Sequence, residues 1–303
     1  MAAARRMLIG AVEGGGTKFA CVIAESPLAV IDRAVIATRD PASTFSDIID
    51  FFQVATRRHG ELAAMAIACF GPLQLRRGAA NYGCLLRTPK EGWSGVDLIA
   101  PFKSRFGVPV CIDTDVAAAA RGELQFGAGR HGSSLAYVTV GTGVGGAVAP
   151  EPVGGRLMHA EMGHLIVRRD PRDAEFAGLC PFHGDCLEGL ASGPAVRARW
   201  GCDLSDLPST HPGRAIVAGY LAQMVVAIAL LHSPEVLVLG GGVMQDAALL
   251  SLVREATCSL LRGYLPPLRD LADVERFIRA PALAGGSGIV GAVQMALDSL
   301  KAV

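Results

Sequence analysis

The segment MLIGAVEGGGTKFACVIAE, Met7 to Glu25, decides the fold. It predicts a β-hairpin, because an apolar strand from Met7 to Val12 meets a glycine turn at Gly14 to Gly16, and a second apolar strand begins near Lys18. The same order of strand, glycine turn and strand returns in SLAYVTVGTGVGGAVA, Ser134 to Ala149. The repetition predicts an α/β protein with two domains of similar plan, each opening with a glycine-closed hairpin.

Strand-like and helix-like patterns alternate through the rest of the chain. Apolar side chains at Phe45, Ile48, Ile49 and Phe52 have helical spacing. Apolar runs predict further strands and helices, with strands at 63–72, 108–115 and 234–243, and helices at 96–107 and 213–232. The domain boundary should fall near 115–121. Because clefts between α/β domains are common ligand sites, we expect the ligand in an interdomain cleft.

Composition excludes several classes of function. The 303-residue chain balances 28 basic against 28 acidic side chains, so no net positive field draws it to nucleic acid or to a membrane surface. The start MAAARRMLIG runs straight into a glycine turn and does not resemble a signal peptide. The most apolar later run, Leu221 to Leu231, is too short to span a bilayer and contains Gln223. We therefore predict a cytoplasmic protein.

Eight cysteines are spread along the chain, without the spacing of a disulfide framework. Cys21, Cys69 and Cys111 lie in apolar runs and are predicted to be small buried residues. Three others are isolated, namely Cys84, Cys202 and Cys258. Only Cys180 and Cys186 form a local group.

Three glycine runs could hold phosphate groups. EGGGTK, Glu13 to Lys18, offers backbone N–H groups, the Thr17 hydroxyl and a lysine charge, and Glu13 could position Mg²⁺. VGTGVGG, 140–146, repeats the arrangement with Thr142, and LGGGVM, 239–244, ends another strand. The spacing fits neither a Walker loop nor a dinucleotide fingerprint. Plain glycine turns are the alternative, but three on one α/β frame favour a bound nucleotide.

Two aspartates, Asp113 and Asp115, stand where a strand meets an alanine-rich helix. A carboxylate there can cap the helix by accepting its unpaired N–H groups. It can also accept a proton from a substrate hydroxyl and so orient the nucleophile in phosphoryl transfer. We expect Asp113 to cap the helix and Asp115 to act as the general base.

Cys180, His183 and Cys186 in LCPFHGDCLEG have C-x₂-H-x₂-C spacing. Thiolates and imidazole suit Zn²⁺, which prefers a fourth ligand in tetrahedral array, and HAEMGH supplies either His159 or His164. A redox pair usually has C-x-x-C spacing, and unlinked thiols are the other alternative. A metal that joined these two segments would bring together the carboxylates of Glu161 and Glu188, which suit sugar hydroxyls.

In this order EGGGTK, IDTDVAAAARGE, VGTGVGG, EMGH, CPFHGDCLEGLASGPA and LGGGVM resemble the ROK family of sugar kinases, over about Leu8 to Met295. EGGGTKF, FGP, TPKEGW and HAEMGH are most similar to its bacterial zinc-dependent fructokinase branch. The resemblance implies the duplicated actin-like ATPase (ribonuclease H-like) fold. It implies a smaller domain over 1–117, completed by a C-terminal helix at about 287–303, and a larger domain over 118–286.

The resemblance also implies ATP-dependent phosphorylation of a hexose, most simply D-fructose to fructose 6-phosphate, with Mg²⁺ and a structural Zn²⁺. It makes Asp115 the general base, and it assigns the other roles by position. The ATP phosphates and nucleotide would be bound by Gly15, Gly16, Thr17, Lys18, Thr142, Gly143, Gly241 and Gly242. The sugar would be bound by Gly71, Asp115, Glu161, His164 and Glu188, and zinc by His164, Cys180, His183 and Cys186. Relatives in this branch are commonly homodimers.

Besides Glu13, which stands where many relatives have aspartate and also fits the fructokinase branch, two positions depart from the family pattern. Thr114 and Ala117 stand where many relatives have asparagine, and both border the expected sugar pocket. Kinases for glucose, mannose or an N-acetylhexosamine therefore remain alternatives, as does a sugar-binding protein without catalysis. The family's repressors carry a helix-turn-helix domain before the kinase-like part, and we do not expect a repressor here, because fewer than ten residues precede the first strand.

Overall fold

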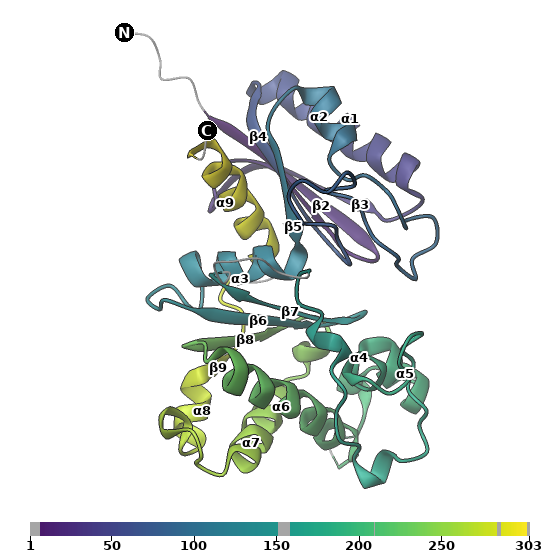
Figure 1. Ribbon diagram of the computed structural model, residues 1–303, viewed down its shortest axis with the longest axis vertical. Coiled ribbons are helices and arrows are strands. Elements are labelled where there is room, and N and C mark those ends of the chain that lie inside the picture. The colour runs from purple at the N-terminus through teal and green to yellow at the C-terminus, as the bar shows by residue number, and fades with distance from the viewer. Residues whose placement is uncertain (1–6, 151–157, 209, 284–285, 302–303) are drawn as a thin grey trace. The chain divides into compact units, whose positions relative to one another are not determined.

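The computed structural model describes residues 7–150, 158–208, 210–283 and 286–301, and it divides into two compact units (Figure 1). Among the described residues, the first unit comprises 7–122, 158–159, 283 and 286–301. The second comprises 123–150, 160–208 and 210–282. The arginines of MAAARR, at the start of the chain, lie outside the described residues.

The first unit is a five-stranded sheet with helices. Its elements are β1 Leu8–Gly14, β2 Lys18–Ser26, β3 Ala29–Ala37, α1 Pro41–His59, β4 Leu62–Cys69, α2 Ala100–Phe106, β5 Val110–Thr114, the first part of α3 Asp115–Phe126, and α9 Ser287–Lys301. The strand order is β3-β2-β1-β4-β5, with β1, β4 and β5 parallel and β2 antiparallel to both of its neighbours. The carboxyl ends of β1, β4 and β5 therefore lie along one edge of the sheet.

Alternation along the strands gives this sheet two apolar faces. Large side chains of β1 and β2 pack with Phe45, Ile48 and Phe52 of α1 on one face. The other face is built from small side chains, chiefly alanines, and is covered by α9 through Ile289 and Val293. Figure 1 shows α1 and α2 on one side of the sheet and α9 on the other.

Helix α9 approaches its neighbours closely because glycines line its contact surface. A Cβ atom added at Gly291 would lie 1.7 Å from the carbonyl oxygen of Ala118 in α3, and one at Gly288 would lie 2.3 Å from a carboxylate oxygen of Glu13. Real Cβ contacts are never this short, so the backbones of α3 and α9 meet only because residue 291 has no side chain.

The second unit is a four-stranded sheet with helices. Its elements are the end of α3, β6 Leu135–Val140, β7 Val144–Ala149, α4 Leu187–Ala191, α5 Gly193–Trp200, α6 Gly213–His232, β8 Val236–Gly240, α7 Leu249–Leu261, α8 Leu271–Phe277 and β9 Ile278–Arg279. The strand order is β7-β6-β8-β9, with β6, β8 and β9 parallel. Helices α6 and α7 lie beside each other against one face of β6 and β8 (Figure 1).

Helix α6 is the central core element of this unit. It is 20 residues long, and its most apolar 18-residue window has a mean hydropathy of 2.0. The run Leu221 to Leu231 is therefore part of a helix long and apolar enough to span a bilayer, contrary to the argument from that run alone. Burial is the better guide, because 56% of its most apolar stretch is already buried inside the protein. Among its buried side chains, Leu221 and Val225 pack with Leu237 and Leu239 of β8. It therefore has the setting of a core helix.

Most predicted elements are present, and several are shorter than predicted, among them the strands expected over 108–115 and 234–243, which are Val110–Thr114 and Val236–Gly240. The helix expected over 96–107 begins only at Ala100, because the Asp97 carboxylate accepts hydrogen bonds from the N–H groups of Ile99 and Ala100, at 2.8 and 2.9 Å. Cys21 and Cys69 are buried as predicted, whereas Cys111 is only half-buried. All eight cysteines are free thiols.

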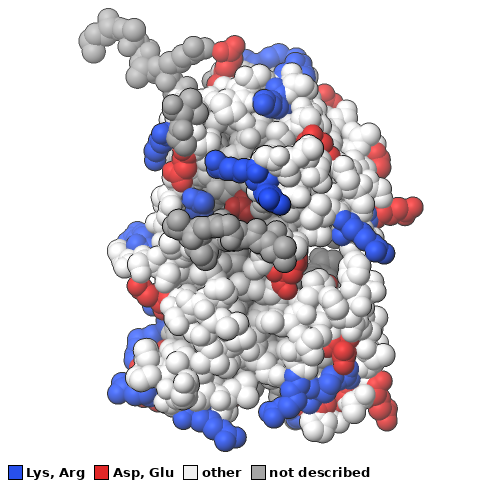
Figure 2. All heavy atoms as spheres, in the orientation of Figure 1, with Lys and Arg blue, Asp and Glu red and all other residues white. Residues whose placement is uncertain are grey.

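Charged side chains are spread over the surface. On the face that Figure 2 displays, basic and acidic side chains are interspersed, and neither sign forms a continuous patch on the described residues. This agrees with the balanced composition of the chain.

We predict that Gly291→Ala destabilises the first unit by more than about 2 kcal/mol, because its methyl group must displace helix backbone. Gly219→Ala in α6 is the matched control, since nothing lies within 4 Å of a Cβ atom there. That control should gain about 0.5–1 kcal/mol from helix propensity. Urea denaturation followed by circular dichroism measures both variants. Equal midpoints would contradict the close approach of α9.

Candidate functional site

The first glycine turn joins β1 to β2. Gly14 pairs with Phe19 in the hairpin, and the N–H of Gly15 donates to the carbonyl of Lys18 at 2.9 Å. Thr38 braces the turn from the end of β3: its hydroxyl donates to the carbonyl of Gly15 at 2.9 Å, and its N–H donates to that of Thr17 at 3.0 Å. Gly16, Thr17 and Lys18 are exposed, as a turn that receives a ligand requires.

Lys90 contacts this turn and was not singled out by sequence reasoning. Its Nζ donates to the carbonyl of Gly16 at 2.6 Å. The position of Lys90 is set by Trp93, which is fully buried, stacks on Phe19 at 5.5 Å between ring centroids, and donates from its indole N–H to the carbonyl of Arg39. The turn therefore has a second lysine besides Lys18. The available signal was the TPKEGW segment itself, in which a lysine stands three residues before a tryptophan.

Asp115 lies at the same sheet edge as this turn. In the register of the parallel strands, Gly14 is opposite Cys69 and Cys69 is opposite Thr114, so the ends of β1, β4 and β5 are level. Asp115 follows Thr114 directly as the first residue of α3. Gly71, the residue expected to contact sugar in this unit, lies two positions after Cys69, next to Phe70, whose N–H donates to the carbonyl of Gly14 at 2.9 Å.

Burial raises the pKa of two carboxyl groups at this edge. The pKa of Asp115 rises to about 6 through desolvation, opposed by a hydrogen bond from the N–H of Val116. The pKa of Glu13 rises to about 7, first through desolvation and then through the nearby negative charge of Asp115, while Lys18 lowers it. A carboxylate with a pKa near 6 is ionised at neutral pH and is a stronger base than an exposed aspartate.

The helix-capping role that was expected of Asp113 belongs to its neighbour Thr114. The helix is capped by Thr114, whose hydroxyl accepts a hydrogen bond from the N–H of Ala117 at 3.1 Å. Asp113 instead accepts from the N–H of Thr114 at 2.8 Å. The two positions that depart from the family pattern are therefore hydrogen-bonded to each other, because Thr114 is the cap and Ala117 is its donor.

The second and third glycine turns lie side by side in the second unit. They follow β6 and β8, which are parallel neighbours, and a Cβ atom on Gly141 would lie 3.8 Å from the backbone nitrogen of Gly242. Gly141 also accepts a hydrogen bond, at 2.7 Å, from the N–H of Gly193 at the start of α5. Thr142 and Gly143, expected to face phosphate, complete the turn between Gly141 and Val144.

The glycines of these turns lack a side chain for two different structural reasons. Gly241 has φ +96°, and a Cβ atom there would lie 2.4 Å from the carbonyl oxygen of Val140, so the fold itself requires glycine. Gly16 and Gly242 have no positive φ, and nothing lies within 4 Å of an added Cβ atom. These two positions leave open space beside the backbone, as close approach of a ligand demands.

The cysteine–histidine segment forms a compact cluster with His164. One ligand atom from each of His164, Cys180, His183 and Cys186 lies within 4.8 Å of all the others. Sγ of Cys180 is 3.6 Å from Nδ1 of both histidines, and Sγ of Cys186 is 3.5 Å from Nδ1 of His164. Zn–S and Zn–N bonds of about 2.3 and 2.1 Å at the tetrahedral angle place S and N about 3.6 Å apart. The cluster therefore has the donor set and the spacing of a tetrahedral zinc site.

His159, the alternative fourth ligand, is placed elsewhere. Its Nε2 accepts a hydrogen bond from the N–H of Leu73 at 2.8 Å, and both residues belong to the first unit. Because His164 uses Nδ1 toward the sulfurs, its Nε2 is the ring nitrogen left for a second role.

Glu188 connects the cluster to the second glycine turn. It stands two residues after Cys186, in the first turn of α4, and its Oε2 accepts a hydrogen bond from the N–H of Val144 at 2.9 Å. The 3₁₀ turn that carries His164 packs on the same strand end, since a Cβ atom on Gly163 would lie 1.9 Å from the carbonyl oxygen of Val144. Glu161 opens that 3₁₀ turn, and its carbonyl accepts from the N–H of His164.

Comparison with known proteins assigns the fold and the family. The sheets and their glycine turns define the actin-like ATPase fold. The crystal structure of the ROK hexokinase from Thermus thermophilus superposes with a TM-score of 0.75 at 24% identity, covering 98% of this chain and 100% of that one. The model of the ROK family matches residues 9–299, and the chain belongs to that family.

Relatives within the family are more similar in sequence. The fructokinase of Zymomonas mobilis is 40% identical over 297 residues, which cover 96% of this chain and 97% of that protein. The fructokinase of Pediococcus pentosaceus is 37% identical over 298 residues, which cover 97% of this chain and 99% of that protein. The resemblance to ROK sugar kinases near the fructokinases is confirmed.

The two neighbouring glycines of the third turn should respond differently to alanine. Gly241→Ala should destabilise the second unit by about 2 kcal/mol or more, because it combines a left-handed backbone with a backbone clash. Gly242→Ala should leave the free energy of unfolding within about 0.5 kcal/mol of wild type. Thermal denaturation without ligand measures both, and equal losses would contradict the geometry of this turn.

Proposed function

We propose that this protein is an ATP-dependent fructokinase, converting D-fructose and ATP to D-fructose 6-phosphate and ADP. The single observation that carries the proposal is the sheet edge of the first unit, where a partly buried Asp115 with a raised pKa stands level with a glycine turn and two lysines. A base beside a phosphate-binding turn is what transfer of a phosphoryl group to an alcohol needs. The choice of fructose is supported by the fructokinases to which the chain is 37–40% identical over nearly full length.

Asp115 acts as the general base. Its ionised carboxylate accepts the proton of the sugar hydroxyl while the hydroxyl oxygen attacks the γ-phosphorus of ATP. The bond from that phosphorus to the β,γ-bridging oxygen breaks, and ADP leaves. Because desolvation raises the pKa of Asp115 to about 6, the carboxylate is both ionised at neutral pH and basic enough to share the proton in the transition state.

The glycine turns bind the phosphates. We assign this role to Gly15, Gly16, Thr17 and Lys18 of the first unit and to Thr142, Gly143, Gly241 and Gly242 of the second. Backbone N–H groups, hydroxyls and lysine charge stabilise the anion, and the absent side chains at Gly16 and Gly242 allow close approach. Lys90 joins this group through its contact with Gly16. Mg²⁺ bound with ATP supplies charge neutralisation for the phosphates.

Sugar hydroxyls are assigned by resemblance to Gly71, Asp115, Glu161, His164 and Glu188. Carboxylates and imidazole can accept and donate to several hydroxyls, which fits a polyol substrate. Glu188 uses one oxygen on the N–H of Val144, which leaves the orientation of its carboxylate fixed and the other oxygen for a ligand.

The cysteine–histidine cluster is proposed to hold a structural Zn²⁺ through His164, Cys180, His183 and Cys186. Support comes from the donor set, two thiols and two imidazoles, and from sulfur–nitrogen spacings of 3.5 and 3.6 Å. Four protein ligands close such a site, so the metal would stabilise the loop rather than take part in the reaction. By analogy with the branch, we further propose a cytoplasmic homodimer.

The function is tested by measuring ATP consumption across a panel of hexoses. We expect fructose to give the highest kcat/KM, because both fructokinase relatives named above cover nearly the whole chain. Preference for glucose, mannose or an N-acetylhexosamine would overturn the choice of fructose while keeping the kinase assignment. No stimulation by any sugar would overturn the kinase assignment itself.

Asp115→Asn should lower kcat by about 10²–10⁴-fold, because the amide cannot accept the proton. Asp113→Asn, two positions earlier at the end of β5, is the matched control and should change kcat by less than about tenfold, since the Asp113 carboxylate accepts a hydrogen bond from the N–H of Thr114 and is assigned no step of the reaction. A kcat near wild type in Asp115→Asn would contradict its role as base.

The pH dependence follows from the raised pKa of Asp115. Below about 6 its carboxyl is protonated and cannot act as base, so kcat/KM should fall about tenfold per pH unit there and be level above it. Glu13, whose pKa is about 7, is the competing source of an inflection. The acid limb should therefore persist in Glu13→Gln, and its loss in that variant would assign the limb to Glu13.

Zinc should be found at one atom per chain by elemental analysis of protein purified without added metal. Cys180→Ser and His183→Ala should lose the metal, because each removes one of four ligands. Cys258→Ser, a free half-buried thiol of α7, is the matched control and should retain it. Metal loss should raise the KM for fructose more than the KM for ATP; the reverse order would contradict support of Glu161 and Glu188 by the cluster.

A further inference from the structure

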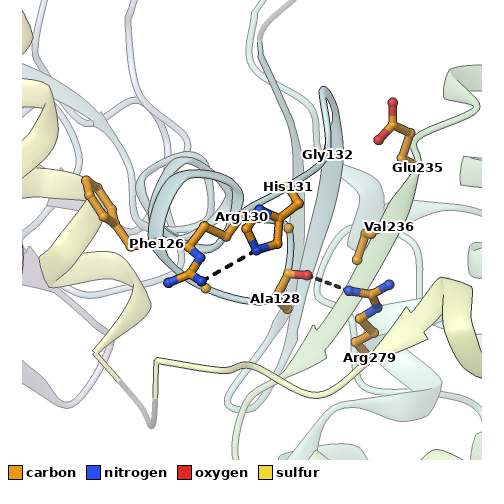
Figure 3. Close-up of a pocket in the computed structure, with 10 residues that line it drawn as sticks. Phe126, Ala128, Arg130, His131, Gly132, Glu235, Val236 and Arg279 are labelled. Carbon is orange, nitrogen blue, oxygen red and sulfur yellow. Dashed lines mark hydrogen bonds between the residues drawn. The ribbon is translucent and has the colours of Figure 1, made fainter.

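A cavity lies in the second unit, at the opposite strand ends from the glycine turns. It has a volume of about 510 Å³. It is lined by the loop Phe126 to Gly132 after α3, by Glu235 and Val236 at the start of β8, and by Arg279 of β9 (Figure 3). Small-molecule sites have volumes of about 300–1,000 Å³, so the cavity is large enough for a metabolite.

Strand register separates this cavity from the phosphate-binding turns. In the parallel pair of β6 and β8, Leu135 is opposite Val236 and Thr139 is opposite Gly240. The cavity lies beside the amino end at Val236, whereas the third glycine turn follows the carboxyl end at Gly240. Four residue steps at about 3.3 Å put roughly 13 Å of strand between the two ends, so no side chain of the cavity belongs to the site already described.

Hydrogen bonds to Glu123 hold the loop that lines the cavity in one conformation. The buried carboxylate of Glu123 accepts hydrogen bonds from the N–H of Ala128 at 2.8 Å and from that of Ala282 at 3.1 Å. The Glu123 carbonyl accepts from the N–H groups of Gly127 and Gly129, and a Cβ atom on Gly129 would lie 2.6 Å from Leu135. The backbone of this wall is therefore fixed before any ligand binds.

Three nitrogen-rich side chains face this cavity. Arg279 is oriented by donating from Nη1 to the carbonyl of Ala128 at 2.7 Å and from Nε to that of Arg276 at 2.8 Å. Arg130 lies beside His131, with 3.5 Å between Nη2 and Nε2. Figure 3 shows Arg130, His131 and Arg279 around Ala128, with dashed lines at these contacts of Arg279 with Ala128 and of Arg130 with His131.

The one carboxylate in the lining does not neutralise these cations. Glu235 accepts hydrogen bonds from both the N–H and the hydroxyl of Ser133, which holds it at the other side of the loop. These bonds lower the pKa of Glu235, so its carboxylate stays ionised and remains hydrogen-bonded to Ser133. The lining itself therefore carries two guanidinium groups and one carboxylate, and the second nearby carboxylate, that of Glu123, is buried beneath the loop and engaged by backbone N–H groups.

We propose that this cavity binds a phosphomonoester, with Arg130, His131 and Arg279 holding the phosphate group. Guanidinium groups bind phosphate oxygens through paired, charge-assisted hydrogen bonds, and Arg279 is already oriented for this. A bare phosphate would leave most of 510 Å³ empty, so the ligand carries an organic part of the size of a small polyol. The site is separate from catalysis, so a phosphorylated metabolite bound there does not compete with ATP or sugar.

Glycerol 3-phosphate is the probe, with inorganic phosphate and glycerol as its two halves. Isothermal titration of the full-length protein should show binding of glycerol 3-phosphate that Arg130→Ala weakens about tenfold, the loss of one charge-assisted contact. Arg172→Ala, which removes an exposed arginine paired with Asp170 in the same unit, is the matched control and should bind as wild type. Arg130→Ala should keep the wild-type kcat and KM for fructose and ATP without the probe.

A second variant distinguishes the loss of a phosphate contact from a loss of folded structure. Arg279→Lys keeps the positive charge but loses the paired geometry, and it should also weaken binding, by several-fold, with an unchanged melting temperature. Absence of binding up to about 10 mM would overturn the proposal, as would binding that Arg130→Ala leaves unchanged. Inorganic phosphate binding as tightly as glycerol 3-phosphate would overturn the phosphomonoester and leave a site for free phosphate.

Discussion

The hydrogen bond from the N–H of Val144 to the carboxylate of Glu188 is the contact on which the arrangement of the second unit depends. It joins the cysteine–histidine cluster, two residues before Glu188, to the glycine turn that ends at Val144. Gly163 and Gly193 contact the same turn from two further segments: a Cβ atom on Gly163 would clash at 1.9 Å with the carbonyl oxygen of Val144, and one on Gly193 would lie at a tight 3.1 Å from that of Gly141. The cysteine–histidine cluster and the second glycine turn are therefore structurally coupled, although Glu188 follows Val144 by 44 positions in the sequence.

The two hairpins reach a similar shape by different means. The first turn is held by side chains that donate into it, from Thr38 and Lys90, and its loop is anchored by the buried ring of Trp93. The second turn is held by backbone contacts and by one carboxylate. A turn held by side chains can adjust to a ligand more readily than a turn in close backbone contact with neighbouring segments. The duplication thus preserves the strand–turn–strand plan while giving the two turns unequal freedom.

Local patterns were enough to predict the hairpins, α1, α6 and the parallel strands, because each buries a regular apolar face. No element was predicted over Ala29–Ala37, since none of the side chains of this strand is fully buried and it shows no such face. Within the site, the cluster of cysteines and histidines is visible in the sequence because three of its members lie close together. The contact of Lys90 with Gly16 spans 74 residues and leaves no periodic signal. The capping role of Thr114, rather than Asp113, depends on a choice of rotamer that composition does not reveal.

The alanine face of the first sheet has a consequence for how the chain folds during synthesis. That face is complete once β5 has been made, yet its cover is Ser287–Lys301, which is translated only after the second unit's described elements. Until then, small apolar side chains of β1, β2 and β4 stay in contact with water, and the sheet has one bare side. The order of translation therefore makes the second unit the first to be able to finish folding, and the first unit waits for the last helix.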